Sequence, residues 1–168
     1  MEEATRKVLF LDFDGVLNNT TLWFEHAAKQ IDQRDPSNNL SSTIVERLNR
    51  VIESTDCHIV VSSAWRWDYT LDQLRGFLSK KGFKYPKRVI DVTNNISPQN
   101  REVEVSEWLL RHPHVKTYAV IDDIEFLFNE IHGNQFVHTE NRHGMTEENV
   151  NEIIEILNKN HEIRQDIR

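Results

Sequence analysis

The stretch KVLFLDFDGVLNN, Lys7 to Asn19, joins a short apolar run to two aspartates that are separated by one residue. The run Val8–Leu11 is typical of a buried strand, which is an unfavourable place for carboxylates. Asp12 and Asp14 would also repel each other unless a bound cation offset their charge. The stretch therefore predicts a buried strand whose carboxyl end carries a cation site.

Short apolar runs and helical patterns alternate along the rest of the chain. Four more runs are typical of buried strands: Ile59–Val61, Val89–Val92, Tyr118–Ile121 and Phe136–His138. Apolar residues recur at helical spacing in five segments, within 44–52, 71–78, 105–109, 124–131 and 150–157. This alternation predicts an α/β fold in which a Rossmann-like, mostly parallel sheet of about five strands carries helices on both faces. We expect one domain over residues 1–160 and a polar tail over residues 161–168.

The composition is that of a globular protein with an acidic balance. The 168 residues have a hydrophobic fraction of 38% and a net charge of -7, which argues against a dedicated nucleic-acid binder. Residues 73–90 nevertheless contain six basic and no acidic residues, so they form either a solvated surface or a patch for an anionic substrate. The single cysteine excludes an intrachain disulfide. No apolar run approaches the ~20 residues of a membrane helix and the N-terminus has no apolar signal region, so we expect a cytoplasmic protein without a membrane partner.

Polar side chains follow three of the predicted strands at the point where each strand ends. They are Asp12 and Asp14 after the first strand, Ser62 and Ser63 after the second, and Asp122 and Asp123 at the end of the fourth. Each pair taken alone is compatible with a helix N-cap or a first-turn acid. In an open parallel sheet, however, ligands bind at the carboxyl ends of the strands. The three pairs together therefore predict a binding site at this edge.

A single chemistry accounts for this set of oxygen-bearing side chains. Clustered carboxylates suit Mg²⁺, which commonly recruits phosphate oxygens to its remaining positions. One carboxylate can attack phosphorus, and a second acid can protonate the leaving oxygen and later activate water. A basic side chain would complete the phosphate clamp. Arg101, at the start of the third predicted helix, is our candidate, with Lys87 and Arg88 as the alternatives.

The motifs FLDFDGVL, IVVSS and AVIDD, with Arg101 between the last two, resemble the four motifs of the haloacid dehalogenase (HAD) superfamily of phosphohydrolases. The resemblance implies that Asp12 is the nucleophile, that Asp14 is the general acid/base, and that Mg²⁺ is the cofactor. The implied metal ligands are Asp12, Asp122, Asp123 and, through its backbone carbonyl, Asp14. The candidate substrate-binding residues are Ser62, Ser63, Arg66 and Arg101. Phosphoester cleavage needs an acid that dehalogenation does not need, so Asp14 favours the phosphatase branch of the superfamily.

Two further stretches, VSSAWR and HGMTEENV, resemble the HAD domains of Swiss Army Knife RNA-repair proteins and the phosphatase domains of polynucleotide kinase/phosphatases. This resemblance implies a phosphorylated nucleic-acid end as the substrate. The segments Asn18–Ser42 and Arg66–Asn100 are too short to fold as the cap domains that HAD enzymes commonly carry. We therefore expect an open site without a large cap, which suits polynucleotide ends or phosphoproteins and leaves small phosphoesters open.

Aromatic and basic side chains flank the first two motifs. Four aromatic residues either stack on bases or pack within the protein: Trp23, Phe24, Trp65 and Trp67. Arg66 either contacts a second phosphate or pairs with acids of the protein surface. Both alternatives depend on tertiary contacts that the sequence leaves open.

Our hypothesis from the sequence is a magnesium-dependent phosphomonoesterase that forms an aspartyl-phosphate and acts on nucleic-acid 3′-phosphate ends. The alternative substrates are nucleotides, other small phosphoesters and phosphoproteins. A non-enzymatic phosphoacceptor of the response-regulator type shares the acids and the metal, but its phosphorylated aspartate lies on a central third strand, where Val89–Val92 offers only Asp91. A binding protein that has lost its activity would not need the intact set of acids.

Overall fold

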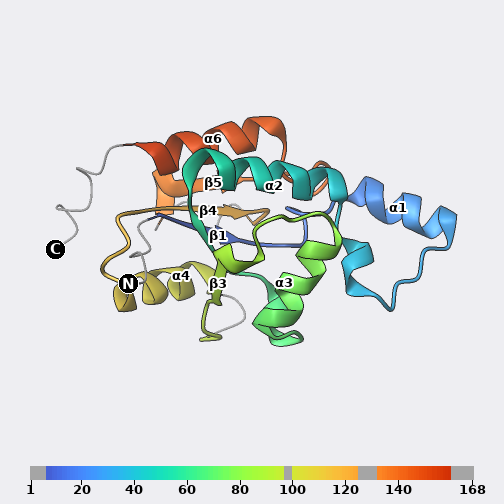
Figure 1. Ribbon diagram of the computed structural model, residues 1–168, viewed down its shortest axis with the longest axis horizontal. Helices are drawn as coiled ribbons and strands as arrows, with labels where there is room; N and C mark the ends of the chain where they lie inside the picture. Colours follow the sequence, from blue (N-terminus) through green and yellow to red (C-terminus); the bar gives the residue numbers. More distant parts are fainter. Residues whose placement is uncertain (1–6, 97–99, 125–131, 160–168) are drawn as a thin grey trace.

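A five-stranded sheet forms the centre of the computed structural model, which describes residues 7–96, 100–124 and 132–159 (Figure 1). All pairings are parallel, and the strand order is β3-β2-β1-β4-β5. The strands are β1 (Lys7–Leu11), β2 (His58–Val61), β3 (Val89–Val92), β4 (Thr117–Asp122) and β5 (Phe136–His138). The predicted α/β, Rossmann-like fold with a parallel sheet is confirmed.

Five α-helices connect or follow these strands in the described residues. They are α1 (Thr20–Lys29), α2 (Ser42–Thr55), α3 (Leu71–Lys80), α4 (Arg101–Arg111) and α6 (Glu147–Asn158). Short 3-10 turns are η1 (Pro36–Asn39), η2 (Ala64–Trp67), η3 (Pro86–Arg88) and η4 (Gly133–Gln135). The predicted helix over 124–131 lies outside the described residues except for its first position. In the described part of the chain, no helix combines the length and the apolar character that crossing a membrane requires.

The helices cover both faces of the sheet, and the alternation of strand side chains divides the core accordingly. Figure 1 shows α2 and α6 on one face and α4 on the other. Leu9 and Leu11 of β1 belong to a cluster with side chains of α2, α3 and α6, whereas Val8 and Phe10 pack with Trp108 of α4. Because successive strand side chains point to opposite faces, Asp12, the next position after Leu11, is directed to the side of α4.

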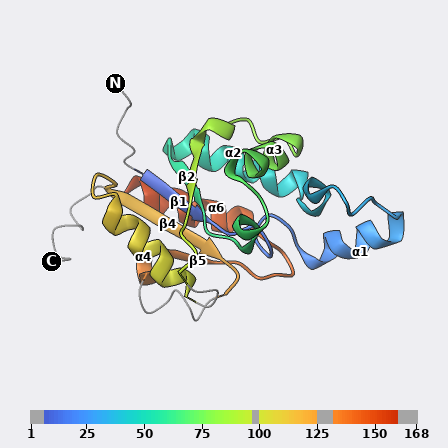
Figure 2. The same ribbon diagram turned by 90° about the horizontal axis from the view of Figure 1, so that it is seen from below.

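The segment between β1 and α2 contains a helix that apolar periodicity does not reveal. Helix α1 has no buried residue, and it projects from the body of the protein (Figure 2). Trp23 and Phe24 on this helix are 64% and 77% exposed. A helix without a buried face needs no apolar stripe, so its sequence lacks the periodic signal. One helix and one 3-10 turn do not make a domain, so the described residues between β1 and α2 hold no large cap, as the sequence predicts.

The basic segment 73–90 forms ion pairs with acids of neighbouring elements. Lys80 pairs with Asp35 and Arg88 pairs with Asp56. Lys84 lies 3.5 Å from Glu46. These contacts support the interpretation of the segment as a solvated surface.

Candidate active site

Asp12 and Asp122 meet at the carboxyl ends of two neighbouring strands. Leu11 of β1 pairs with Ile121 of β4, and the Asp12 backbone N–H donates to the Ile121 carbonyl at 3.2 Å. Both carboxylates are buried, at 3% and 1% exposure. Backbone groups orient them: Phe13 N–H donates to Asp12 Oδ1 at 2.8 Å, and Ile124 N–H donates to Asp122 Oδ1 at 2.9 Å. The local turns after the strands therefore hold the carboxylates in place.

Arg101, the first residue of α4, lies between these two carboxylates. Its Nη1 atom is 3.1 Å from Asp12 Oδ1 and 3.0 Å from Asp122 Oδ2. The same atom lies 3.4 Å from the carbonyl oxygen of Ser62. Of the three basic candidates, Arg101 is thus the one whose side chain contacts the carboxylates of Asp12 and Asp122. The alternatives, Lys87 and Arg88, belong to η3 just before β3, which places them at the opposite, amino-terminal edge of the sheet.

Asp12, Asp122 and Asp123, hereafter the acidic cluster, could hold a metal ion. One carboxylate oxygen from each residue lies within 4.8 Å of the other two. Burial raises the pKa of Asp12 and of Asp122 above the ordinary carboxylate value, although Arg101 opposes the shift. Asp122 Oδ2 is buried and accepts no hydrogen bond from the described part of the chain, although it faces Arg101. A hard cation such as Mg²⁺ fits this donor set, because it would supply the positive charge that one arginine cannot provide to three acids.

Gly15 allows the chain to pass close to Asp123. Its φ angle is +75°, and a Cβ atom at this position would lie 2.5 Å from Asp123 Oδ2. The Thr139 hydroxyl donates to the Gly15 carbonyl at 2.8 Å and fixes the turn from the end of β5. A larger residue would be strained and would displace a member of the acidic cluster.

The Asp14 side chain is exposed and lies outside the acidic cluster. Asn18 Nδ2 donates to Asp14 Oδ1 at 2.9 Å, and Trp65 Nε1 donates to Asp14 Oδ2 at 3.0 Å. The carboxylate is therefore held at the mouth of the site. The contact of its backbone carbonyl with a metal stays a prediction.

The hydroxyls of Ser62 and Ser63 have different surroundings. Ser62 is buried at the end of β2, and its Oγ has no hydrogen-bond partner among the residues that the structure describes. Ser63 Oγ instead accepts from the Trp65 backbone N–H at 3.3 Å and caps η2. Ser62 thus has a free hydroxyl for a ligand, whereas a substrate contact by Ser63 stays a prediction.

Arg66 is enclosed by the protein. Its side chain is 2% exposed and forms an ion pair with the buried carboxylate of Glu104 on α4. It also donates to the Ser63 carbonyl at 2.6 Å. These contacts tie the turn after β2 to the helix that begins at Arg101. They favour pairing with a protein acid over a phosphate contact, and substrate binding by Arg66 stays a prediction.

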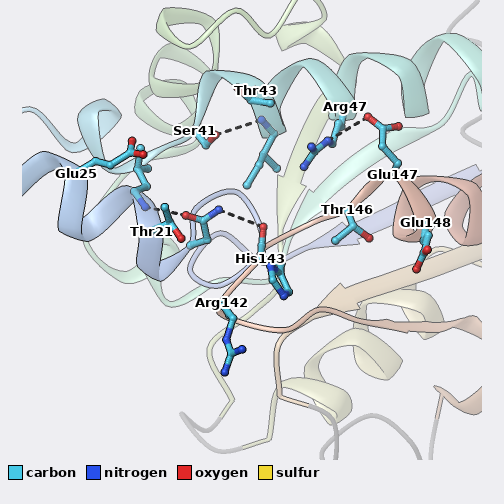
Figure 3. Close-up of a pocket in the computed structure, with 13 residues that line it drawn as sticks. Thr21, Glu25, Ser41, Thr43, Arg47, Arg142, His143, Thr146, Glu147 and Glu148 are labelled. Carbon is cyan, nitrogen blue, oxygen red and sulfur yellow. Dashed lines mark hydrogen bonds and ion pairs between the residues drawn. The ribbon is translucent and has the colours of Figure 1, made fainter.

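A hollow of about 680 Å³ lies beside α1, among the amino-terminal ends of α1, α2 and α6 (Figure 3). Asn19 Nδ2 donates to the His143 carbonyl at 3.2 Å, which closes one side of it. None of the residues of the acidic cluster, and neither Asp14 nor Arg101, lines this hollow. The edge of the sheet, rather than the hollow, is therefore the candidate active site.

The fold and the site together define a class of protein. A parallel Rossmann-like sheet that carries clustered aspartates and an arginine at its carboxyl edge has the arrangement of the HAD phosphohydrolases. Residues 8–150 match the family described as the HAD domain in Swiss Army Knife RNA repair proteins, and the chain belongs to this family. The family indicates a phosphoric monoester hydrolase. Comparison with curated proteins and with solved structures gave no significant match.

Three side-chain contacts of the site were not predicted from the sequence. Asn18 and Trp65 contact Asp14, and Glu104 contacts Arg66. Glu104 lies beside Val105 and one turn from Trp108, on the apolar face of α4. The position of an acid on that face was the signal by which the sequence could have revealed it. The contacts of Trp65 and Asn18 carry no pattern in the sequence, because they depend on how the turns after β1 and β2 approach each other.

Proposed function

We propose that this protein is a magnesium-dependent phosphomonoesterase that forms an aspartyl-phosphate on Asp12 and acts on nucleic-acid 3′-phosphate ends. The observation that carries the proposal is the acidic cluster with Arg101 between Asp12 and Asp122. Mg²⁺ would be held by the acidic cluster and would neutralise charge on the phosphoryl group. Membership in a phosphatase family supports the reaction class.

The reaction proceeds in two successive displacements at phosphorus. Asp12 attacks phosphorus, so that an oxygen–phosphorus bond forms to Asp12 while the bond to the leaving oxygen breaks, and Asp14 gives its proton to that oxygen. Asp14 then takes a proton from water, which attacks the same phosphorus and releases phosphate and free Asp12. Arg101 and the Ser62 hydroxyl bind the phosphoryl oxygens throughout.

The open position of Asp14 and the exposed aromatic residues support a large substrate. Trp23 and Phe24 are exposed on α1, which follows the nucleophile turn, and exposed aromatic rings stack on bases of single strands. The Trp65 ring packs against Phe13 with centroids 5.1 Å apart, which favours packing within the protein over base stacking for this residue. Small phosphoesters and phosphoproteins are the alternative substrates at the same site. A phosphoacceptor without turnover does not agree with the family.

The function is tested by phosphate release from a panel of substrates in Mg²⁺ and in EDTA. The panel contains oligonucleotides phosphorylated at the 3′ or the 5′ end, nucleotides, sugar phosphates and phosphopeptides. We expect the 3′-phosphorylated oligonucleotide to be the best substrate, and we expect EDTA to abolish its turnover. Preference for another member of the panel would refute the substrate assignment, and release that persists in EDTA would refute the role of the metal. No release from any member would refute the proposed function itself.

Replacement of Ser62 by alanine is expected to have opposite effects on stability and activity. A buried hydroxyl without a partner costs about 1–3 kcal/mol, so S62A should raise the free energy of unfolding. Loss of one phosphoryl donor should lower kcat/KM on the order of 10²-fold. Thermal melting and steady-state kinetics measure the two effects.

Ser63→Ala is the matched control for S62A. Its hydroxyl caps η2, so S63A should lower the melting temperature where S62A raises it. A stability loss in S62A would mean that the Ser62 hydroxyl has a structural partner and would contradict its assignment to the phosphoryl group.

A further inference from the structure

We infer that Trp65 is a positioning residue for proton transfer, because its indole N–H holds the Asp14 carboxyl in the orientation that serves the leaving oxygen. This inference rests on the proposed function, in which Asp14 is the general acid. The carrying observation is the hydrogen bond of 3.0 Å from Trp65 Nε1 to Asp14 Oδ2. It joins the turn after β2 to the turn after β1.

The Asp14 carboxyl needs such a partner because it is exposed. A short carboxylate at the mouth of an open site can rotate freely and bond to water unless the protein holds it. Trp65 and Asn18 each donate to a different oxygen of the group, which fixes both its position and its plane. Each oxygen accepts one hydrogen bond and keeps a lone pair that can carry the transferable proton.

The indole ring is itself anchored in an aromatic cluster. Its centroid lies 5.1 Å from that of Phe13, 5.8 Å from Tyr69 and 6.2 Å from Phe77. Phe13, the residue between Asp12 and Asp14, is fully buried. The N–H that faces Asp14 is therefore held by the hydrophobic core, and it cannot follow a rotating carboxyl.

Asn18, the other hydrogen-bond partner of Asp14, makes further hydrogen bonds in the same turn. It accepts from the Gly15 backbone N–H at 2.8 Å and donates to the Asn39 carbonyl at 2.9 Å. Its replacement would disturb the turn as well as Asp14. Trp65→Phe is the cleaner test, because phenylalanine keeps an aromatic ring in the cluster and removes only the N–H donor.

The test compares two substrates whose leaving groups differ in their need for a proton. The alkoxide released from a 3′-phosphorylated oligonucleotide needs the proton of Asp14, whereas nitrophenolate leaves p-nitrophenyl phosphate without one. W65F should lower kcat/KM for the oligonucleotide about 10- to 100-fold, within the range that general acid catalysis contributes. It should change kcat/KM for p-nitrophenyl phosphate less than about threefold. The parameter kcat/KM reports only the steps through release of the leaving group, and nitrophenolate needs no proton in those steps.

Two controls separate positioning from a structural effect. Tyr69→Phe keeps a ring of the same aromatic cluster, with its centroid 5.8 Å from that of Trp65, and it should leave the ratio of the two kcat/KM values unchanged. In an Asp14→Ala background, W65F should cause no further loss with the oligonucleotide, because the group through which it acts is gone. Equal losses with both substrates, or a further loss in the Asp14→Ala background, would overturn the inference.

A measurement without turnover tests the hydrogen bond itself. The indole N–H resonance of Trp65 should shift upfield, and the proton should exchange faster, in Asp14→Ala than in the wild type. An unchanged resonance would overturn the inference about Trp65 and leave the proposed function standing. A wild type that hydrolyses neither substrate would refute the proposed function, and the role of Trp65 in proton transfer with it.

Discussion

Asp12→Asn is expected to abolish phosphate release from every substrate while the protein stays folded. A carboxamide does not attack phosphorus, and loss of a catalytic nucleophile costs on the order of 10⁴- to 10⁶-fold in kcat. The fold should survive because Asp12 is buried among other acids, and burial raises its pKa. Steady-state kinetics in Mg²⁺ and thermal melting in EDTA measure the two results.

The effect of D12N on stability has a defined pH dependence. Because the pKa of Asp12 is higher in the folded protein than in the unfolded chain, its ionisation destabilises the fold progressively as the pH rises from the ordinary carboxylate pKa to the raised value. Asparagine does not ionise, so the advantage of D12N in melting temperature should grow over this interval. Retained turnover in D12N would show that Asp12 is not the nucleophile. A lower melting temperature that worsens with pH would contradict the electrostatic description of the acidic cluster.

Arg101→Met should have the next largest effect, and it should act on both activity and stability. Removal of one positive donor from a phosphoryl site costs about 10²- to 10³-fold in kcat/KM. Arg101 is also the cation between Asp12 and Asp122, and its side chain is only 12% exposed. Breaking a buried ion pair by removal of one partner costs up to about 3–5 kcal/mol, so R101M should melt well below the wild type in EDTA.

Magnesium should restore part of this loss. With Arg101 removed, the acidic cluster holds unopposed negative charge, so a bound cation should raise the melting temperature of R101M more than that of the wild type. Arg111→Met is the matched control, because Arg111 ends the same helix and forms a surface pair with Glu107. It should change stability by less than about 1 kcal/mol. Equal effects of R101M and R111M would contradict the central place of Arg101.

Apolar periodicity was sufficient to predict most of the fold. All five predicted strands are present, and their parallel arrangement follows from the helices between them. Helix α1 was missed because none of its residues is buried. Periodicity detects a helix only through the face that it buries, and α1 has no buried face.

The residues of the site also differ in how well the sequence predicted their positions. Asp12, Asp122 and Asp123 could be predicted to converge because each lies at or just after the carboxyl end of a strand of one parallel sheet, and position in the strand determines where the side chain emerges. Ser63 and Arg66 were grouped with Ser62 by adjacency alone. Their hydroxyl and guanidinium instead bond to the Trp65 backbone and to Glu104, which are contacts within the protein.

The local sequence pattern therefore determines the strands, the helices that pack on them and the residue types at the strand ends. Each of these depends on residues that are near one another in sequence. Tertiary structure alone selected Arg101 over Lys87 and Arg88, since that choice depends on which edge of the sheet a residue reaches. It also decided what holds Asp14. Of the two described side chains that donate to the second aspartate of FLDFDGVL, Asn18 is close in sequence, whereas the fold brings the Trp65 indole to it across 51 residues. Contacts of this range leave no periodic trace, because they arise only after the core has packed.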